Sequence, residues 1–321
     1  MPERVLVSGA TGFLGSHVAQ AFVEVGYEVR CGLRATSDPR WISDLPVELT
    51  PLDFARPQSL PRAVKDVDII VHAAGLVKAR QKSDYYLINA EGTRRIAAAA
   101  VDAGVRRFVL ISSLAARGPE AMAKDGRDHP ASAYGWSKLE AEESLRALGK
   151  QMEIVALRPA GVYGPRDTDL LPLFKLAQSG WLVLPSRPSV LQPVYVSDVA
   201  QAALAAARKP VGFGPYPVAE ASRYTWQDTA KGLERTLGRP VRTVRLPAAA
   251  FKLAGWVAEK AAGLRGDVLP VFDERRASDL AVHTWTCDLS GTERALGWEA
   301  EVRLFEGLER TTRWYRREGW I

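Results

Sequence analysis

A glycine-rich turn near the start of the chain constrains the fold more than any other feature. Residues 5–7 (Val-Leu-Val) read as a buried strand, and residues 8–15 follow as Ser-Gly-Ala-Thr-Gly-Phe-Leu-Gly. Apolar residues then recur at helical spacing as far as Gly26, which ends the pattern. A strand, a tight turn and a helix in this order are typical of the first unit of a parallel α/β sheet.

The alternation of strand and helix continues through the first half of the chain. Apolar runs rich in β-branched residues predict strands buried on both faces, at residues 29–33, 67–71, 108–111 and 154–157. Helical patterns between them cover residues 85–103 and 133–148, and a glycine follows each. Right-handed crossovers between such strands place helices on both faces, so we predict a doubly wound parallel sheet.

The spacing of the glycines also predicts a ligand. Gly9, Gly12 and Gly15 permit a tight turn and let the backbone approach a pyrophosphate without an intervening Cβ. The free N–H groups and the positive end of the helix dipole then face the phosphates. We therefore interpret the sheet as a Rossmann sheet that binds a dinucleotide.

The pattern changes after residue 165. Prolines cluster between residues 165 and 193, and a short strand at 194–196 leads into a helix at 197–208. Scattered helices are predicted at residues 226–237, 248–264 and 304–317. We predict a dinucleotide-binding domain and a smaller, discontinuous, mainly helical C-terminal substrate lobe that caps the carboxyl ends of the strands. The first comprises residues 1–165 with 193–215 returning to it, and the lobe comprises 166–192 and 216–321.

Composition excludes several classes of protein. No stretch of the 321 residues offers the roughly 20 near-continuous apolar residues of a transmembrane helix, and the first strand leaves no room for a secretory signal. Cys31 and Cys287 are too few for a disulfide scaffold and lack metal-ligand spacing, so no metal site is predicted. The net charge of +6 is spread thinly. We expect a soluble, cytoplasmic protein that does not bind nucleic acid.

The end of the second strand distinguishes the two nicotinamide cofactors. NAD sites place an acidic residue there for the ribose hydroxyls, whereas a 2′-phosphate is accommodated by an arginine. Leu33 stands where the acid would be, and Arg34 follows it. Because a guanidinium forms charge-assisted bonds to a phosphate, we predict NADP as the preferred cofactor, with NAD as the alternative.

Tyr134 and Lys138 form the first part of a predicted catalytic group. Their spacing of four residues places them on one face of the helix at 133–148. A free phenol has a pKa near 10, but a neighbouring ammonium and an oxidised nicotinamide favour the phenolate. We predict that Tyr134 is the general acid or base at a carbonyl or alcohol oxygen, and that Lys138 supports it and bonds the nicotinamide ribose.

A serine pair completes the predicted catalytic group. Ser112 and Ser113 follow the strand at 108–111, and the carboxyl ends of parallel strands are where ligands bind in open α/β sheets. A hydroxyl there can hold the substrate oxygen in place for Tyr134. We assign this role to Ser113 and interpret Ser112 as a turn residue that bonds the backbone.

These motifs together resemble the extended branch of the short-chain dehydrogenase/reductase superfamily, the NAD-dependent epimerase/dehydratase family. The similarity covers nearly the whole chain. It includes the glycine turn, Asp53, His72-Ala73-Ala74-Gly75, Asn89 with Gly92 and Thr93, Ser113, Tyr134, Lys138, Arg158-Pro159, Gly164-Pro165 and residues 194–198.

The resemblance implies further cofactor contacts. It places Asp53 at the adenine, residues 73–75 beneath the cofactor, and Asn89 and the backbone near Pro159 and Val162 at the nicotinamide half; alternatively, Asn89 caps a turn. The residues expected to bind the cofactor are Gly9, Thr11, Gly12, Phe13, Leu14, Gly15, Arg34, Asp53, Phe54, Ala73, Ala74, Gly75, Asn89, Tyr134, Lys138, Pro159 and Val162. A homodimer is a further expectation that the resemblance raises.

Departures from the family patterns favour one branch. Dehydratases of this family carry an Asp-Glu pair after the catalytic hydroxyl residue, where this chain has Leu114 and Ala115. Sugar-nucleotide epimerases typically carry an asparagine at the position of Gly161 and an arginine at that of Leu191, although Arg166 or Arg187 could substitute for the latter. The chain is more similar to dihydroflavonol-4-reductase-like and 3β-hydroxysteroid-dehydrogenase-like enzymes.

The sequence thus predicts an NAD(P)-dependent oxidoreductase that interconverts a ketone and a secondary alcohol on a small-molecule substrate. Five aromatic residues of the lobe are available to line an apolar pocket, or alternatively to pack its core: Trp181, Tyr216, Trp226, Phe251 and Trp256. Two other functions stay open, a nucleotide-sugar 4-epimerase and a non-catalytic protein that senses cofactor, binds RNA or serves assembly. The apolar segment at 248–264 also suits attachment to a membrane surface or burial within the lobe.

Overall fold

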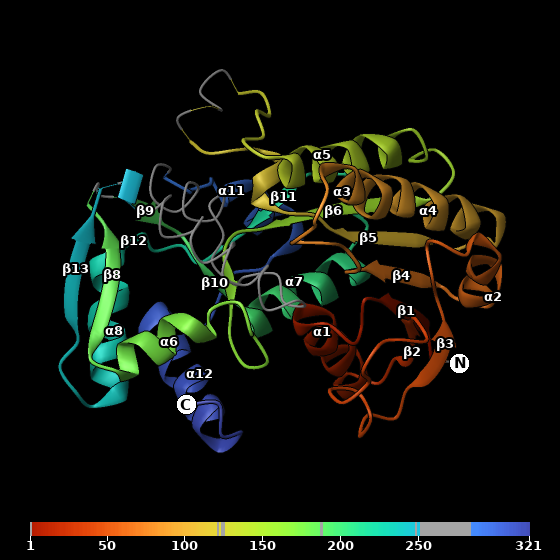
Figure 1. Ribbon diagram of the computed structural model, residues 1–321. Helices are drawn as coiled ribbons and strands as arrows, with labels where there is room; N and C mark the ends of the chain where they lie inside the picture. Colours follow the sequence, from red (N-terminus) through yellow and green to blue (C-terminus); the bar gives the residue numbers. More distant parts are fainter. Residues whose placement is uncertain (1, 121, 123–125, 187–188, 248, 251–283) are drawn as a thin grey trace.

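A seven-stranded parallel sheet forms the centre of the molecule, which confirms the predicted doubly wound α/β fold (Figure 1). The computed structural model describes residues 2–120, 122, 126–186, 189–247, 249–250 and 284–321. The strand order is β11-β6-β5-β4-β1-β2-β3. The strands are β1 (Arg4–Ser8), β2 (Glu28–Leu33), β3 (Glu48–Pro51), β4 (Ile69–His72), β5 (Arg107–Ile111), β6 (Glu153–Pro159) and β11 (Tyr216–Val218).

Helices cover both faces of this sheet because successive side chains of a strand point to opposite sides. Val5 and Val7 of β1 pack with α1 (Phe13–Glu24) and α7 (Val196–Arg208). Leu6 packs on the other side, in a second apolar cluster. That cluster draws on α2 (Leu60–Val64), α4 (Gly92–Asp102) and α5 (Ala133–Arg146), which lie above the sheet in Figure 1.

The helix predicted over residues 85–103 is interrupted. The structure has α3 (Lys82–Tyr85), then a π-helical stretch η2 (Tyr86–Glu91), and then α4. Within η2, the side chain of Asn89 bonds the loop after β4, and its carbonyl accepts the Thr93 hydroxyl at 2.6 Å. Such single π-helical turns recur at functional sites, where they redirect a side chain.

A second body of structure lies to one side of the sheet (Figure 1). Its helices α6 (Leu171–Gln178), α8 (Trp226–Leu237) and α12 (Leu304–Arg317) share one apolar core, which includes Phe174, Leu233 and Leu308. Its strands β8 (Trp181–Pro185) and β13 (Arg242–Leu246) pair in parallel. Shorter pairs join β9 (Val190–Leu191) to β12 (Tyr224–Thr225), and β7 (Val162–Tyr163) to β10 (Val194–Tyr195).

Two segments differ from the predicted domain boundaries. The second segment of the lobe is predicted to begin at residue 216, but β11 pairs with β6 as an edge strand of the central sheet. Leu296, at the end of α11 (Ser290–Leu296), and Trp298 pack in the core that α1 and α7 share with the sheet. The predicted helix at 248–264 lies outside the described residues, except for residues 249–250. Among the residues that are described, no helix is long and apolar enough to cross a membrane.

Candidate active site

The glycine turn closes tightly between β1 and α1. The Gly12 N–H donates to the Gly9 carbonyl at 3.0 Å, and Gly9 has a φ of +72°. A Cβ on Gly15 would lie 2.1 Å from the Gly9 carbonyl oxygen, so no larger residue fits there. No side chain caps the start of α1, and its first turn carries no acidic residue. The N-terminal N–H groups of this helix therefore suit the pyrophosphate of a dinucleotide.

The segment after β4 joins this turn to the predicted catalytic helix. A Cβ on Gly9 would lie 2.7 Å from the Ala74 Cα, so the turn and this segment are in direct contact. At the other end, a Cβ on Gly75 would lie 3.0 Å from Asn89 Oδ1 and 3.5 Å from Lys138 Nζ. Residues predicted from three separate motifs thus meet along one edge of the sheet.

Asn89 holds the loop and the helix together. Its Oδ1 accepts the Leu76 N–H at 2.7 Å, and its Nδ2 donates to the Leu76 carbonyl and to Ser137 Oγ, each at 3.0 Å. The Ser137 hydroxyl in turn donates to the Tyr134 carbonyl at 2.8 Å. The buried amide therefore does more than cap a turn, because it links the cofactor-side loop to the first turn of α5.

A buried histidine continues this hydrogen-bond network beneath the loop. His72 Nδ1 lies 2.7 Å from Ser8 Oγ, and its Nε2 lies 3.0 Å from Thr93 Oγ1. Because the Thr93 hydroxyl donates to the Asn89 carbonyl, it accepts from Nε2–H, and Nδ1 accepts from Ser8. Burial, assisted by the charge of Lys138, lowers the pKa of His72 to about 3. The ring is therefore neutral in the folded protein.

Lys138 is buried at the end of β5. Its Nζ donates to the Ile111 carbonyl at 2.8 Å. Burial lowers the pKa of Lys138 to about 8, while the charge of Glu142 opposes this shift. One helical turn earlier, half-buried Tyr134 packs edge-on against Tyr85, with ring centroids 6.1 Å apart. The predicted pair therefore lies on the inner side of α5, next to the carboxyl end of the sheet.

The structure changes the role of one of the two serines. Buried Ser112 donates its hydroxyl to the Glu142 carboxylate, so its assignment as a backbone-bonding turn residue is wrong. Ser113 accepts the Ala115 N–H at 3.1 Å and caps η3 (Leu114–Ala116), and the same hydroxyl can still donate a hydrogen bond. A Cβ on Gly135 would lie 2.4 Å from the Ala115 carbonyl oxygen, so η3 packs directly against the turn that carries Tyr134.

A buried charged cluster supports this arrangement, and the sequence alone did not reveal it. Arg158 of β6 bonds the Glu142 carboxylate of α5 at 2.6–3.2 Å and Asp128 at 2.6 and 2.7 Å. Burial opposes the charge of Arg158, but these bonds outweigh it and raise its pKa. The cluster fastens the loop before α5 to the sheet. Arg158 lies 16 residues from Glu142 and 30 from Asp128, so no local spacing predicts the cluster.

The residues predicted for the adenosine half lie at the ends of β2 and β3. Leu33 pairs with Pro51, so Arg34 and Asp53 both follow the same edge of the sheet. Arg34 is exposed, and among the described residues no carboxylate pairs with it. Asp53 is half-buried; its Oδ1 accepts the Ala55 N–H at 3.0 Å and its Oδ2 lies 3.8 Å from the exposed Arg56 guanidinium.

Other predicted cofactor residues surround this edge. Phe54 packs edge-on against His72, with ring centroids 5.5 Å apart, and thus supports the hydrogen-bond network of His72. Pro159, at the end of β6, is buried, and Val162, in β7, is partly buried. Thr11, Phe13 and Leu14 occupy the turn and the first residues of α1, all partly exposed.

An apolar group lies next to Ser113. Leu114, Ala219, Cys287 and Leu289 form a buried cluster, and Trp285 packs against it with Ala160. Two backbone hydrogen bonds hold the segment that contains Trp285 and Cys287. The Trp285 N–H donates to the Val190 carbonyl at 3.0 Å, and the Cys287 N–H donates to the Gln192 side chain at 2.9 Å. These contacts hold residues 285–289 against the segment that follows β5.

Several residues that sequence reasoning offered for substrate binding lie elsewhere. Arg166 bonds Ser16 and Gln20 of α1, so its guanidinium is engaged there rather than on a diphosphate. Tyr216 packs against the core of the central sheet and Trp226 against that of the lobe. Trp181 is 44 % exposed on β8. Arg187, Phe251 and Trp256 lie outside the described residues.

Comparison with known proteins agrees with this geometry. The family model described as "NAD dependent epimerase/dehydratase family" matches residues 5–219. The chain is 34 % identical to a ceramide reductase of Caulobacter vibrioides, over 99 % of this chain and 96 % of that protein. It is 26 % identical to the UDP-glucose 4-epimerase of Vibrio cholerae, over 97 % and 95 %.

Solved structures share the whole architecture. The crystal structure of gox2253 is 25 % identical to this chain, covers 100 % of both chains and superimposes with a TM-score of 0.79. The glycine turn and the helix with Tyr134 and Lys138 both lie within the residues that the family model matches. The chain belongs to the NAD-dependent epimerase/dehydratase family, the extended short-chain dehydrogenases/reductases.

Proposed function

We propose that this protein interconverts a ketone and a secondary alcohol, with NADP(H) as its cofactor. The observation that carries the proposal is the buried Lys138 ammonium, held on the Ile111 carbonyl one helical turn from Tyr134. When bound, the nicotinamide cofactor supplies or accepts a hydride at the substrate carbon. The remaining requirement is a proton at the substrate oxygen, and the protein must provide it.

Tyr134 provides that proton during reduction. The nearby ammonium stabilises the phenolate that forms when the proton leaves, which brings a group of ordinary pKa near 10 toward the working range. Ser113, at the end of β5, holds the same substrate oxygen by a hydrogen bond. In the reverse direction, Tyr134 accepts the alcohol proton. General acid–base catalysis of this kind typically contributes 10²–10⁴-fold.

The cofactor assignment rests on the edge formed by β2 and β3. The uncapped N-terminus of α1 and the glycine turn hold the pyrophosphate, and Asp53 approaches the adenine. Arg34 is exposed and free to contact a 2′-phosphate. The preceding position holds Leu33 and not the acidic residue that would repel this phosphate. NADP is thus favoured over NAD, although the family as a whole is NAD-dependent.

The substrate is proposed to be apolar and ceramide-like. Partly exposed Ala160 and Trp285, which pack on the buried cluster of Leu114 and Cys287, offer it an apolar surface near Ser113. Gly161 is exposed and has open space around its Cα, and Leu191 pairs with Tyr224. Neither residue supplies the polar side chain that a nucleotide-sugar diphosphate would require. The similarity to a ceramide reductase over nearly the whole chain supports this substrate class.

Epimerisation of a nucleotide sugar is the second candidate, because the UDP-glucose 4-epimerase relative also spans nearly the whole chain. The decisive experiment incubates the purified protein either with NADPH and long-chain ketones or with UDP-glucose and an oxidised cofactor, NAD⁺ or NADP⁺. The proposal expects NADPH oxidation that depends on the ketone, and no UDP-galactose. Interconversion of the two UDP-sugars without net cofactor turnover would overturn it.

A further inference from the structure

The β8–β13 ribbon presents one face to the lobe and the other to the outside. Leu182 and Leu184 are buried in the lobe core with α6 and α8. Trp181 and Val183 alternate with them and therefore point outward. On β13, Arg242 pairs with Trp181 and Val244 pairs with Val183, so these side chains share the outward face.

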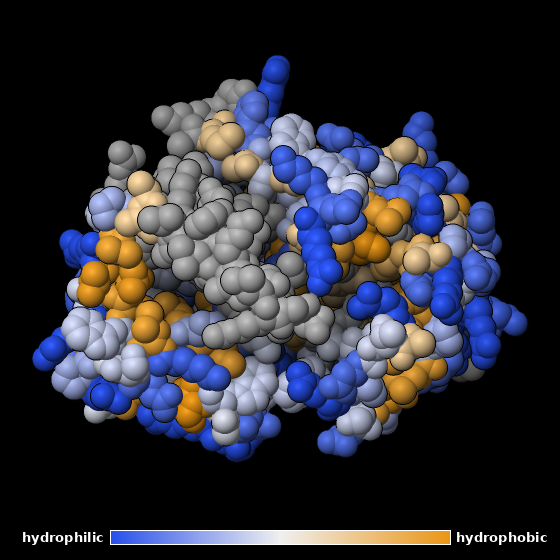
Figure 2. All heavy atoms as spheres, viewed as in Figure 1, coloured by the Kyte–Doolittle hydropathy of each residue, from blue (hydrophilic) through white to orange (hydrophobic). Residues whose placement is uncertain are grey.

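This outward face is apolar and exposed. Trp181 is 44 % exposed and Val244 is 40 % exposed. The Arg242 guanidinium carbon lies 5.5 Å from the centroid of the Trp181 ring, so its charge stands over the indole at the rim of the face. In Figure 2, hydrophobic surface gathers over the position that β8 and β13 occupy in Figure 1.

The charged residues of the ribbon and of the segments that adjoin it in sequence all have one sign. Residues 171–186 and 238–247, which form α6, the ribbon and their adjoining turns, contain no aspartate or glutamate. They contain four basic residues, Lys175, Arg239, Arg242 and Arg245. An apolar centre whose own strands and adjoining segments carry only cationic residues complements a surface that is apolar inside and negatively charged outside.

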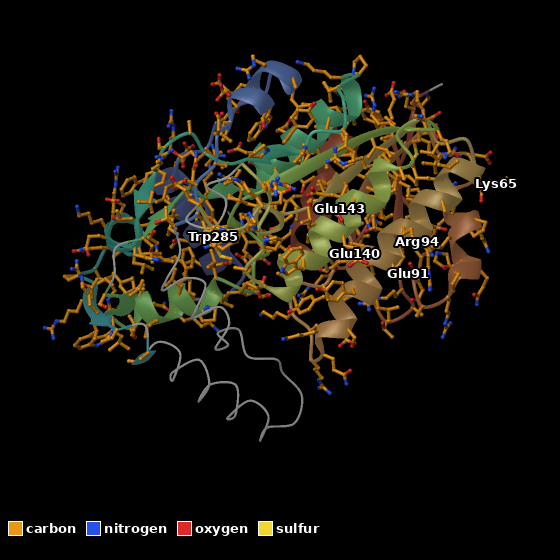
Figure 3. The ribbon with its side chains drawn as sticks, turned by 90° about the horizontal axis from the view of Figure 1, so that it is seen from above. Lys65, Glu91, Arg94, Glu140, Glu143 and Trp285 are labelled. Carbon is orange, nitrogen blue, oxygen red and sulfur yellow. The ribbon has the colours of Figure 1, made fainter. Side chains whose placement is uncertain are left out.

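A second group of exposed apolar residues lacks this property. Leu87 of η2 and Trp136 of α5 are 53 % and 48 % exposed. Seen from above, α4 and α5 lie side by side (Figure 3), and the Glu91 carboxylate is paired with Arg94 and Arg95. Glu140 and Glu143 lie along α5. These carboxylates would be repelled by an anionic surface, so the cationic face of the ribbon is the better match.

We propose that the outward face of the β8–β13 ribbon binds the surface of an anionic phospholipid bilayer. Tryptophan favours the membrane–water interface because its ring is apolar while its N–H can stay hydrated. Arg239 and Arg242 can keep their charged ends at the headgroups while their stems lie over apolar surface. Each such residue adds a modest attraction to an anionic surface, so several together with the apolar contact give reversible binding.

Sedimentation of the full-length protein with lipid vesicles tests the proposal. One set of vesicles contains phosphatidylcholine alone, and the other contains phosphatidylglycerol and phosphatidylcholine in equal parts. Val244→Glu introduces a carboxylate into the face, and Arg242→Glu reverses a charge at its rim. Val25→Glu is the matched control, because Val25 follows α1 and is 44 % exposed, similar to Val244.

We expect the wild type and Val25→Glu to sediment with the anionic vesicles, and high salt to release both. Val244→Glu and Arg242→Glu should bind at least about tenfold more weakly, because they introduce charges of the same sign as the lipid. Both should keep the wild-type turnover of a water-soluble ketone, which separates this test from that of the reaction. The proposal is overturned if anionic vesicles do not bind the wild type, or if all variants bind alike. Light scattering that shows a smaller assembly for Val244→Glu would also overturn it, since the face would then join protein chains.

Discussion

The ammonium of Lys138 donates to the carbonyl of Ile111 at 2.8 Å, and this bond joins the catalytic helix to the end of a central strand. The carbonyl belongs to the last residue of β5, two positions before Ser113. A single contact therefore fixes the position of the ammonium relative to both the serine and Tyr134. It also explains how a lysine charge is retained in a buried site, because a carbonyl and a nearby Glu142 both favour the charged form.

Replacement of this ammonium should reduce catalysis far more than folding. We expect Lys138→Met to lower kcat/KM for ketone reduction by about 10²–10⁴-fold, since the phenolate of Tyr134 loses its neighbouring charge. The optimum pH for alcohol oxidation should rise as well, because the phenol becomes harder to ionise. Steady-state kinetics across pH measure both effects. Lys150→Met, at an exposed position after α5, is the control and should behave as the wild type.

A methyl group on the glycine turn should abolish dinucleotide binding. In Gly15→Ala the Cβ would meet the Gly9 carbonyl oxygen at 2.1 Å, so the turn must open. We expect thermal stabilisation by NADPH to disappear in this variant. Gly291→Ala is the matched control: no atom lies within 4 Å of the added Cβ, and the residue is in the first turn of α11. It should keep the NADPH effect, and equal losses in both variants would contradict the role of the turn.

Cofactor preference should depend on Arg34. We expect Arg34→Gln to weaken NADPH binding by about 10–100-fold, the usual size of a charge-assisted bond, and to leave NADH binding within about twofold. Calorimetric titration with each cofactor measures the ratio. Arg40→Gln tests for a general effect of charge, since Arg40 is exposed a few residues further along the chain. An unchanged NADPH-to-NADH ratio in Arg34→Gln would contradict the NADP assignment.

The buried His72 predicts how stability changes with acidity. Its pKa is about 3 in the folded protein, below the ordinary value of 6.5, so the unfolded chain binds the additional proton. The contribution of this group is therefore complete above pH 6.5 and falls by up to about 1.4 kcal/mol per pH unit as the pH drops toward 3. Urea unfolding at pH 7, 6 and 5 measures the slope.

A variant isolates that contribution from the other titrating groups. His72→Gln should be less stable at pH 7, because Ser8 and Thr93 lose a buried partner. Its stability should fall less steeply below pH 6.5, by the contribution of about one proton. Burial and the charge of Arg166 also lower the pKa of His17, to about 4. His17 therefore takes up a second proton on unfolding in both the wild type and the variant. Equal slopes in wild type and variant would show that His72 is not kept neutral by the fold.

The sequence predicted the strands and the catalytic helix because both are encoded locally. Continuous apolar runs identify buried parallel strands, and the spacing of Tyr134 and Lys138 identifies one helix face. The residues that hold the site together were harder to predict. Asn89 acts through Leu76 and Ser137, and Arg158 through Asp128 and Glu142, pairs that are separated along the chain. Local patterns do not encode such pairings.

The misplaced boundaries have equally specific causes. The strand β11 is three residues long and contains Pro217, which resembles a loop in sequence. Such a strand is tolerated because it lies at the sheet edge, where a missing N–H removes no bond between central strands.

The pairing of β8 with β13 joins residues about sixty positions apart, so neither strand could be assigned a partner from its own pattern.

The transfer of deuterium from the nicotinamide ring to the substrate carbon tests the central claim most directly. NADPH deuterated at the reactive carbon of its ring is incubated with a long-chain ketone, and the alcohol is analysed by mass spectrometry. We predict an alcohol that carries one deuterium at the former carbonyl carbon. Tyr134→Phe should form it at least about 100-fold more slowly while binding NADPH normally. An alcohol without deuterium, or a Tyr134→Phe rate equal to that of the wild type, would contradict the account.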